Sequence, residues 1–196
     1  MPSLARLPMA SRHRPPAKIP FVDRLGRDDI VFALRSLAEE LAPTAQPLEL
    51  VVVGGAALVL LYGARETTKD VDAFSRTTAG AASLRDASRR VAVRLSLPED
   101  WLNDGAKGYV HGLSLGEVLL TTPSLVVRTL APQQLLAMKL SAWRDDVDIE
   151  DARLLLSKIG PDREAAWRLI APHLVPGREL KAEYAFDDLW GARDAP

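Results

Sequence analysis

The sequence has 196 residues and no cysteine, which excludes disulfides, thiolate catalysis and cysteine–zinc sites. Hydrophobic residues make up 47% and charged residues 26%, as in ordinary globular proteins large enough to bury a core. No apolar stretch approaches the ~20 residues of a membrane span, and the N-terminus lacks an apolar segment of signal-peptide length. We therefore expect a cytoplasmic protein without membrane contact. The net charge of −1 gives no global attraction for nucleic acid, so any basic surface must be local.

The first segment, residues 1–20, is rich in proline and basic residues and contains no acidic residue. This composition buries too little apolar surface to fold, so we expect a flexible basic arm. Contact with the phosphate backbone of an RNA is its functional interpretation, and an unstructured leader or a misassigned start codon is the simpler one. We expect the core over residues 21–130 and a helical region over residues 131–196.

The first predicted helix is Asp28 to Leu41. Its apolar residues recur at helical spacing, and Asp28 or Asp29 can cap its start. We expect this helix to pack on a sheet and assign it no chemistry.

A strand, a glycine turn and a helix follow. The run Leu50–Val53 is rich in β-branched residues and short enough for a buried strand. It stops at Gly54-Gly55, and Ala56–Tyr62 predicts a short, almost wholly apolar helix. Glycines at such a turn let the backbone approach a phosphate, while free N–H groups at the helix start point toward it. The pattern is therefore suited to binding the phosphates of a nucleotide.

The next predicted strand, Asp70–Phe74, carries two carboxylates. Side chains alternate along a strand, so Asp70 and Asp72 lie on one face. Two such carboxylates can hold Mg²⁺ or Mn²⁺, hard cations that also bind phosphate oxygens. Together with the glycine turn, the pair predicts a site for a metal–triphosphate complex.

A basic stripe is expected on a helix from about Gly80 to Leu95. A solvated surface is the ordinary explanation of such a stripe, and an RNA-binding border of the active cleft is the sharper one. The stripe consists of Arg85, Arg89, Arg90 and Arg94.

Two more strands are predicted at Glu117–Leu120 and Leu125–Arg128, after a loop around Trp101. We expect Trp101 to pack in the core. Asp104 and Glu117 are the only nearby candidates for a third metal-binding acid, and neither lies in a convincing pattern.

Pro132 begins the next predicted helix, a position where its missing N–H is harmless. Lys139 lies beside the apolar face of this helix, three or four residues from its apolar neighbours. A lysine in that place either lays its aliphatic stem over the core or brings a cation close to the two aspartates.

The following helix runs to about Ile159, and Asp148 and Asp151 lie three residues apart near its start. Acids in a first turn ordinarily cap N–H groups and complement the helix dipole. Two further amphipathic helices are expected at about residues 162–171 and 178–190.

This chain resembles the nucleotidyltransferase superfamily, in which a strand–Gly-Gly or Gly-Ser–helix unit precedes a strand with Asp-x-Asp. It is most similar to the AbiEii-type toxin nucleotidyltransferases of bacterial toxin–antitoxin systems. The matching segments are Gly54–Leu58, Gly63–Asp72 with one extra residue before the first aspartate, and Leu135–Leu154. The resemblance covers about half of the chain. It implies an α/β (α+β) fold, with a mixed sheet flanked by helices and a C-terminal helical region.

The resemblance also implies roles for individual residues. Asp70 and Asp72 would hold Mg²⁺ or Mn²⁺, and Lys139 would face the nucleotide phosphates with Asp148 beside it at the catalytic face. The implied nucleotide-binding residues are Gly54, Gly55, Arg65, Lys139 and Asp151. The implied partners are an NTP, an RNA such as the 3′ end of tRNA, and a cognate antitoxin.

Three functions remain open on the sequence. The first is transfer of a nucleoside monophosphate from an NTP to a hydroxyl, with release of pyrophosphate. The second is a catalytically inactive binding module, favoured by the missing third carboxylate and by Gly-Gly in place of Gly-Ser. The third is transfer of a nucleotide to a protein or to a small molecule such as an aminoglycoside.

Overall fold

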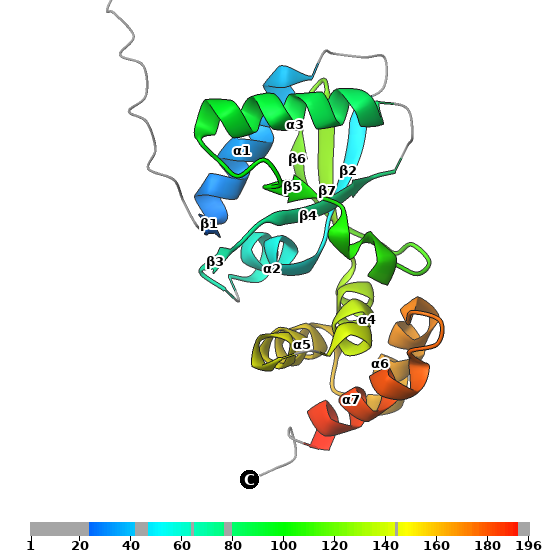
Figure 1. Ribbon diagram of the computed structural model, residues 1–196. Helices are drawn as coiled ribbons and strands as arrows, with labels where there is room; N and C mark the ends of the chain where they lie inside the picture. Colours follow the sequence, from blue (N-terminus) through cyan, green and yellow to red (C-terminus); the bar gives the residue numbers. More distant parts are fainter. Residues whose placement is uncertain (1–23, 42–46, 64, 77–79, 144, 192–196) are drawn as a thin grey trace, which may run out of the picture.

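The computed structural model describes residues 24–41, 47–63, 65–76, 80–143 and 145–191, so the expected arm over residues 1–20 lies outside the described part. A five-stranded mixed sheet with the strand order β5-β4-β2-β7-β6 forms the upper part of the molecule in Figure 1. Central β2 runs antiparallel to β4 and parallel to β7. The strands are β2 (Leu48–Val52), β4 (Val71–Ser75), β5 (Leu102–Asn103), β6 (Leu115–Thr121) and β7 (Leu125–Leu130).

Helices flank this sheet, which confirms the expected mixed α/β fold. In Figure 1, α1 and α3 lie in the upper part with the sheet, and α4 to α7 gather below it. Each begins and ends within a few residues of a predicted helix. They are α1 (Arg27–Glu40), α2 (Gly54–Tyr62), α3 (Ala81–Leu95), α4 (Pro132–Ala142), α5 (Asp146–Ile159), α6 (Arg163–Ile170) and α7 (Glu179–Gly191).

Several short elements escaped prediction. A two-stranded antiparallel ladder pairs β1 (Leu25–Gly26) with β3 (Thr67–Thr68). The turn η1 (Gly105–Tyr109) follows β5, and η2 (Ala171–His173) follows α6. Strands of two residues and short 3₁₀ turns carry too few side chains for a periodic pattern, so sequence periodicity cannot reveal them.

The core explains why the central strand reads as a continuous apolar run. Leu50, Val51 and Val52 are all fully buried, because the sheet is covered on both faces there. Trp101 is also fully buried and its indole N–H donates to the Ser88 carbonyl at 3.1 Å, which confirms that it packs in the core. Among the described residues, no helix has the length and apolarity needed to cross a membrane.

The start of α1 differs from the prediction. Gly26 is the N-cap residue, rather than Asp28 or Asp29. Asp29 instead accepts a hydrogen bond from the Gly26 backbone N–H at 2.9 Å, so a carboxylate still satisfies a donor at this helix end, from the third helical position.

The helical part is built around α4. Its residues from Gln134 to Ala142 are all buried, because α5, α6 and α7 pack around it. Phe186 of α7 lies against Trp167 and Trp190, with ring centroids 5.0 and 5.6 Å away. β7 ends at Leu130 and α4 begins at Pro132. The division into a core over residues 21–130 and a helical region over residues 131–196 stays a prediction.

Candidate active site

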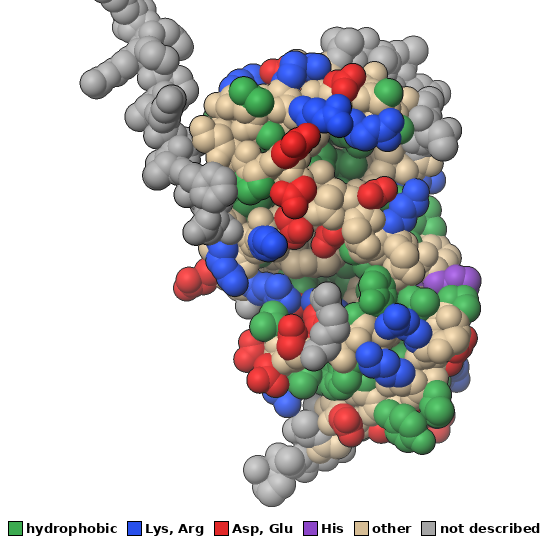
Figure 2. Space-filling model, viewed as in Figure 1, with side chains coloured by type: hydrophobic (Ala, Val, Ile, Leu, Met, Phe, Trp, Pro, Cys, Tyr) green, Lys and Arg blue, Asp and Glu red, His purple; other side chains and the backbone are tan. Residues whose placement is uncertain are grey.

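A cavity of about 930 Å³ brings the predicted site residues together. Its wall combines the start of α2, the start of β4, η1, α4 and α5. In Figure 2, acidic side chains gather over β4 and β5, above the helical part. The predicted residues that line the cavity are Gly54, Gly55, Arg65, Asp70, Asp72, Lys139 and Asp148, and Asp151 binds two of them.

Glycine is required at both positions of the turn because the side chains of Asp72 and Thr68 approach its backbone closely. Gly54 has φ +61°, and a Cβ there would lie 3.2 Å from Asp72 Oδ2. At Gly55 a Cβ would lie only 2.7 Å from Thr68 Oγ1. Glycine at both positions therefore lets the α2 start lie directly against Asp72 and Thr68.

The two aspartates lie side by side on the cavity wall, both half-buried. Asp70 lies just before β4 rather than within it, because the strand begins at Val71. Val71 and Ala73 point to the other face, where they are buried in the core. Asp70 Oδ2 accepts from Asn103 Nδ2 at 3.0 Å, and Asp72 Oδ1 accepts from the Ala106 N–H at 3.1 Å. Both carboxylates thus line the same cavity, and neither is sealed in the interior.

Neither of the two acids expected as a third metal ligand joins this pair. Asp104 and Glu117 are exposed, and neither lines the cavity. Glu117 instead lies near Tyr62, whose pKa is raised first by burial and then by the charge of Glu117. Within the described ranges, no group of three or more histidine or acidic side chains could hold a metal ion.

Asp70 and Asp72 nevertheless fit a magnesium or manganese ion. The pair offers only hard oxygen donors, and no histidine is found among the described residues of the cavity wall. Mg²⁺ commonly binds one or two carboxylates and takes its other ligands from water and substrate phosphates. The structure therefore suits a metal that arrives with, or is completed by, a polyphosphate.

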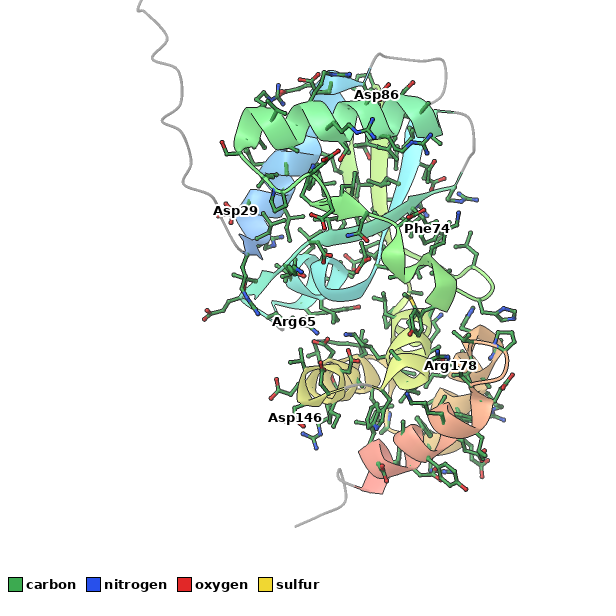
Figure 3. The ribbon with its side chains drawn as sticks, viewed as in Figure 1. Asp29, Arg65, Phe74, Asp86, Asp146 and Arg178 are labelled. Carbon is green, nitrogen blue, oxygen red and sulfur yellow. The ribbon has the colours of Figure 1, made fainter. Side chains whose placement is uncertain are left out.

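Lys139 is the centre of a charged quartet that consists of Arg65, Lys139, Asp148 and Asp151. Its Nζ lies 2.6 Å from Asp148 Oδ1 and 2.7 Å from Asp151 Oδ2. Arg65 binds both oxygens of Asp151, with Nε 2.9 Å from Oδ1. Figure 3 shows Arg65 between α2 and α5. The quartet thus joins the loop after α2 to the helical part by contacts 86 residues apart in sequence.

The contacts of the quartet show whether the aspartates on α5 cap the helix or bind Lys139. Asp145 is the N-cap residue, and its carboxylate accepts from the Asp148 N–H at 3.0 Å. Asp148 and Asp151 are almost fully buried against Lys139. Capping is therefore done by Asp145, and the other two aspartates form ion pairs with Lys139.

Sequence reasoning missed several residues of the cavity wall. Arg24 and Lys69 are exposed cations that the β1–β3 ladder brings to the wall, and neither forms an ion pair within the part of the chain that the structure describes. Asn103 and Tyr109 come from β5 and η1. Their place in the wall depends on strand pairing and on a short turn, which sequence periodicity does not reveal.

The arginine stripe of α3 does not border the cavity, which corrects the RNA-cleft interpretation. None of its four arginines lines the wall. Arg90 pairs with Glu40 at 2.7 Å, and Arg94 with Glu39 at 3.2 Å, so the stripe joins α3 to α1.

One comparison with known proteins adds to this geometry. A family model described as a nucleotidyltransferase of unknown function (DUF6036) matches residues 30–158, more than half of the chain. The match includes the glycine turn, both aspartates and the helices of the quartet, and it supports the nucleotidyltransferase superfamily without singling out the AbiEii-like toxins. No curated protein and no solved structure matches the chain. By its sequence the chain belongs to this family of nucleotidyltransferases.

Proposed function

We propose that the protein transfers a nucleoside monophosphate from a metal-bound NTP to a hydroxyl group and releases pyrophosphate. The observation that supports this most directly is the single cavity. In it the glycine turn at the start of α2 lies directly against one of the two carboxylates. A Cβ added at Gly54 would lie 3.2 Å from Asp72 Oδ2. Polyphosphate and divalent cation would therefore meet at the same place.

Asp70 and Asp72 would hold Mg²⁺ or Mn²⁺. The metal, when bound, would neutralise phosphate charge and favour ionisation of the attacking hydroxyl. The N–H groups at the start of α2 would bind phosphate oxygens beside it. A bond would form between the acceptor oxygen and the α-phosphorus, the bond to the bridging oxygen would break, and the hydroxyl proton would leave to water.

The cations of the cavity would divide their work. A lysine ammonium has three N–H donors, and Asp148 and Asp151 take two of those on Lys139. The third can bind a phosphate oxygen, while Asp148 and Asp151 fix the direction of the side chain. Because the quartet contains two cations and two anions, it adds no net charge. Arg24 and Lys69 would supply the net positive charge that a triphosphate requires.

For the acceptor we propose RNA, in particular the 3′ end of tRNA, and for the biological role the toxin of a toxin–antitoxin pair in the cytoplasm. Both rest on the resemblance of Gly54–Leu58, Gly63–Asp72 and Leu135–Leu154 to AbiEii-like toxins. Growth arrest on expression of the wild type, absent with Asp70→Ala, tests the second of these proposals.

The decisive experiment follows α-labelled NTPs into an acceptor. The purified protein is incubated with each NTP, Mg²⁺ or Mn²⁺, and total RNA, and is compared with Asp70→Ala. Asp86→Ala is the matched control, because Asp86 is exposed on α3 and does not line the cavity. Label in RNA with the wild type and the control, but not with Asp70→Ala, supports the proposal.

Two other outcomes separate the alternatives. Label in a protein or small molecule but not in RNA would mean that the acceptor is not RNA, while the proposed nucleotidyl transfer stands. NTP binding without transfer to any acceptor favours the inactive binding module. Its supporting observation is that, among the residues that the structure describes, no group of three or more acidic or histidine side chains could hold a metal ion.

A further inference from the structure

The shortest strand of the main sheet lies beside the two aspartates. β5 has two residues and pairs in parallel with β4, so that Leu102 is opposite Val71 and Asn103 is opposite Asp72. The neighbouring Trp101 is fully buried, and its carbonyl accepts from the Val71 N–H at 2.7 Å. This anchor fixes the strand, and the strand places Asn103 next to the carboxylates.

The Asn103 amide is used at both ends. Nδ2 donates to Asp70 Oδ2 at 3.0 Å, and Oδ1 accepts from the Gly105 N–H at 2.8 Å. Nδ2 also lies 3.4 Å from the Asp100 carbonyl. The opposite orientation of the amide would set its oxygen against the Asp70 carboxylate and its NH₂ group against the Gly105 N–H. The direction of the donor toward Asp70 is therefore determined by its surroundings.

Asn103 belongs to a segment that serves both aspartates. Three residues later, the Ala106 N–H donates to Asp72 Oδ1 at 3.1 Å. Between them, Gly105 permits the close approach, since a Cβ there would lie 3.0 Å from Asn103 Oδ1 and 3.6 Å from Asp72 Oδ1. One loop thus gives each carboxylate a neutral N–H donor.

Neutral donors can orient the two carboxylates without cancelling their charge. Two neighbouring carboxylates repel each other and tend to rotate apart. A cation would hold them together but would cancel the charge that attracts a metal, whereas an amide orients a carboxylate and leaves its charge intact. We propose that Asn103 is a positioning residue, which holds the Asp70 carboxylate in the direction needed to bind a divalent cation. This inference rests on the proposed function.

Manganese binding tests it without turnover. Mn²⁺ is titrated into the NTP-free protein, and the free ion is measured by electron paramagnetic resonance. We expect Asn103→Ala to weaken Mn²⁺ binding about 10- to 100-fold, the usual effect of losing a hydrogen-bond partner of a metal ligand. The control is Gln133→Ala, which removes a half-buried amide that donates to Ser114 Oγ at 3.0 Å outside the cavity.

A second variant separates positioning from folding of the loop. In Asn103→Ser the shorter side chain can still accept from the Gly105 N–H, but it is too short to reach Asp70. We expect the same weakening of Mn²⁺ binding with an unchanged unfolding temperature, and recovery of the NTP KM at saturating Mn²⁺. A lowered unfolding temperature with a KM that stays high at saturating Mn²⁺ would reveal a purely structural role and overturn the inference.

Failure of the inference and failure of the proposed function give different results. If the wild type binds Mn²⁺ and both Asn103 variants bind it equally well, Asn103 does not position Asp70 and the proposed function stands. If the wild type and Asp70→Ala bind Mn²⁺ equally or not at all, both in the NTP-free protein and in the presence of a non-hydrolysable NTP analogue, the metal site itself is wrong.

Discussion

The two pairs of aspartates around the cavity differ in their burial and in the contacts that hold them. Asp70 and Asp72 accept hydrogen bonds from the neutral Asn103 amide and the Ala106 N–H, and both are half-buried. Asp148 and Asp151 are almost fully buried and are ion-paired with Lys139. A neutral donor orients a carboxylate, whereas a salt bridge also cancels its charge. The first pair is therefore suited to binding a metal, and the second to holding the wall of the cavity in place.

Loss of Lys139 gives the largest effect that this comparison predicts. Lys139→Met leaves two buried carboxylates without their shared cation, and breaking a buried pair costs about 3–5 kcal/mol. We expect a drop of this size in the free energy of unfolding, measured by urea denaturation. Lys107→Met, at an exposed position outside the cavity, is the control and should change it by less than about 0.5 kcal/mol. A loss below about 1 kcal/mol in Lys139→Met would mean that the quartet does not stabilise the fold.

The opposite behaviour is expected for Asp70 and Asp72, where a substitution should reduce activity without reducing stability. Asp72→Asn keeps the size of the side chain and removes its charge. Metal-dependent transfer should therefore fall by more than about 100-fold, because loss of a metal ligand costs more than loss of a residue that only hydrogen-bonds to a ligand. The unfolding temperature should stay equal or rise slightly, since repulsion between two carboxylates is relieved. The measurement pairs a transfer assay with thermal unfolding, and Asp86→Asn on α3 is the control. Wild-type transfer by Asp72→Asn would remove the distinction between the pairs.

A substitution at the glycine turn tests the close approach of the start of α2 to Thr68 of β3, just before the first pair of aspartates. A Cβ at Gly55 would lie 2.7 Å from Thr68 Oγ1, so Gly55→Ala should destabilise the protein by about 1–3 kcal/mol through overpacking. In Gly55→Ala/Thr68→Ala the obstructing hydroxyl is gone and most of the loss should be recovered. A double-mutant cycle measured by urea denaturation gives the coupling, and additive effects would show that the two residues do not meet.

The smallest predicted effects belong to the exposed cations. Arg24→Ala or Lys69→Ala should raise the NTP KM about two- to five-fold, because an exposed charge contributes up to about 1 kcal/mol. The effect should shrink as salt rises, since ions screen exposed charges. Arg85→Ala is the control, because Arg85 is equally exposed on α3 and lies outside the cavity. Equal KM values for all three variants would mean that Arg24 and Lys69 do not contribute to binding of the triphosphate.

The sequence predicted the larger elements well and the charged contacts poorly. Its apolar runs and periodic patterns located all of the helices from α1 to α7, together with β2, β4, β6 and β7, because each of these elements is long enough to carry such a pattern. Of the four arginines that the sequence placed at helical spacing on α3, Arg90 and Arg94 both form ion pairs with α1. Their acidic partners on α1 were not predictable, since about 50 residues separate Arg90 from Glu40.

The same division holds within the cavity. The spacing of Gly54-Gly55, Asp70 and Asp72 by itself determined that a glycine turn at a helix start and two carboxylates share one supersecondary unit. Strand alternation and turn geometry are local, so the sequence specifies them. Only the tertiary structure decided that Lys139 pairs with Asp148 and Asp151 and that Asn103 reaches Asp70. These contacts depend on how a two-residue strand pairs and how two helices pack, and such long-range geometry leaves no periodic trace in a single sequence.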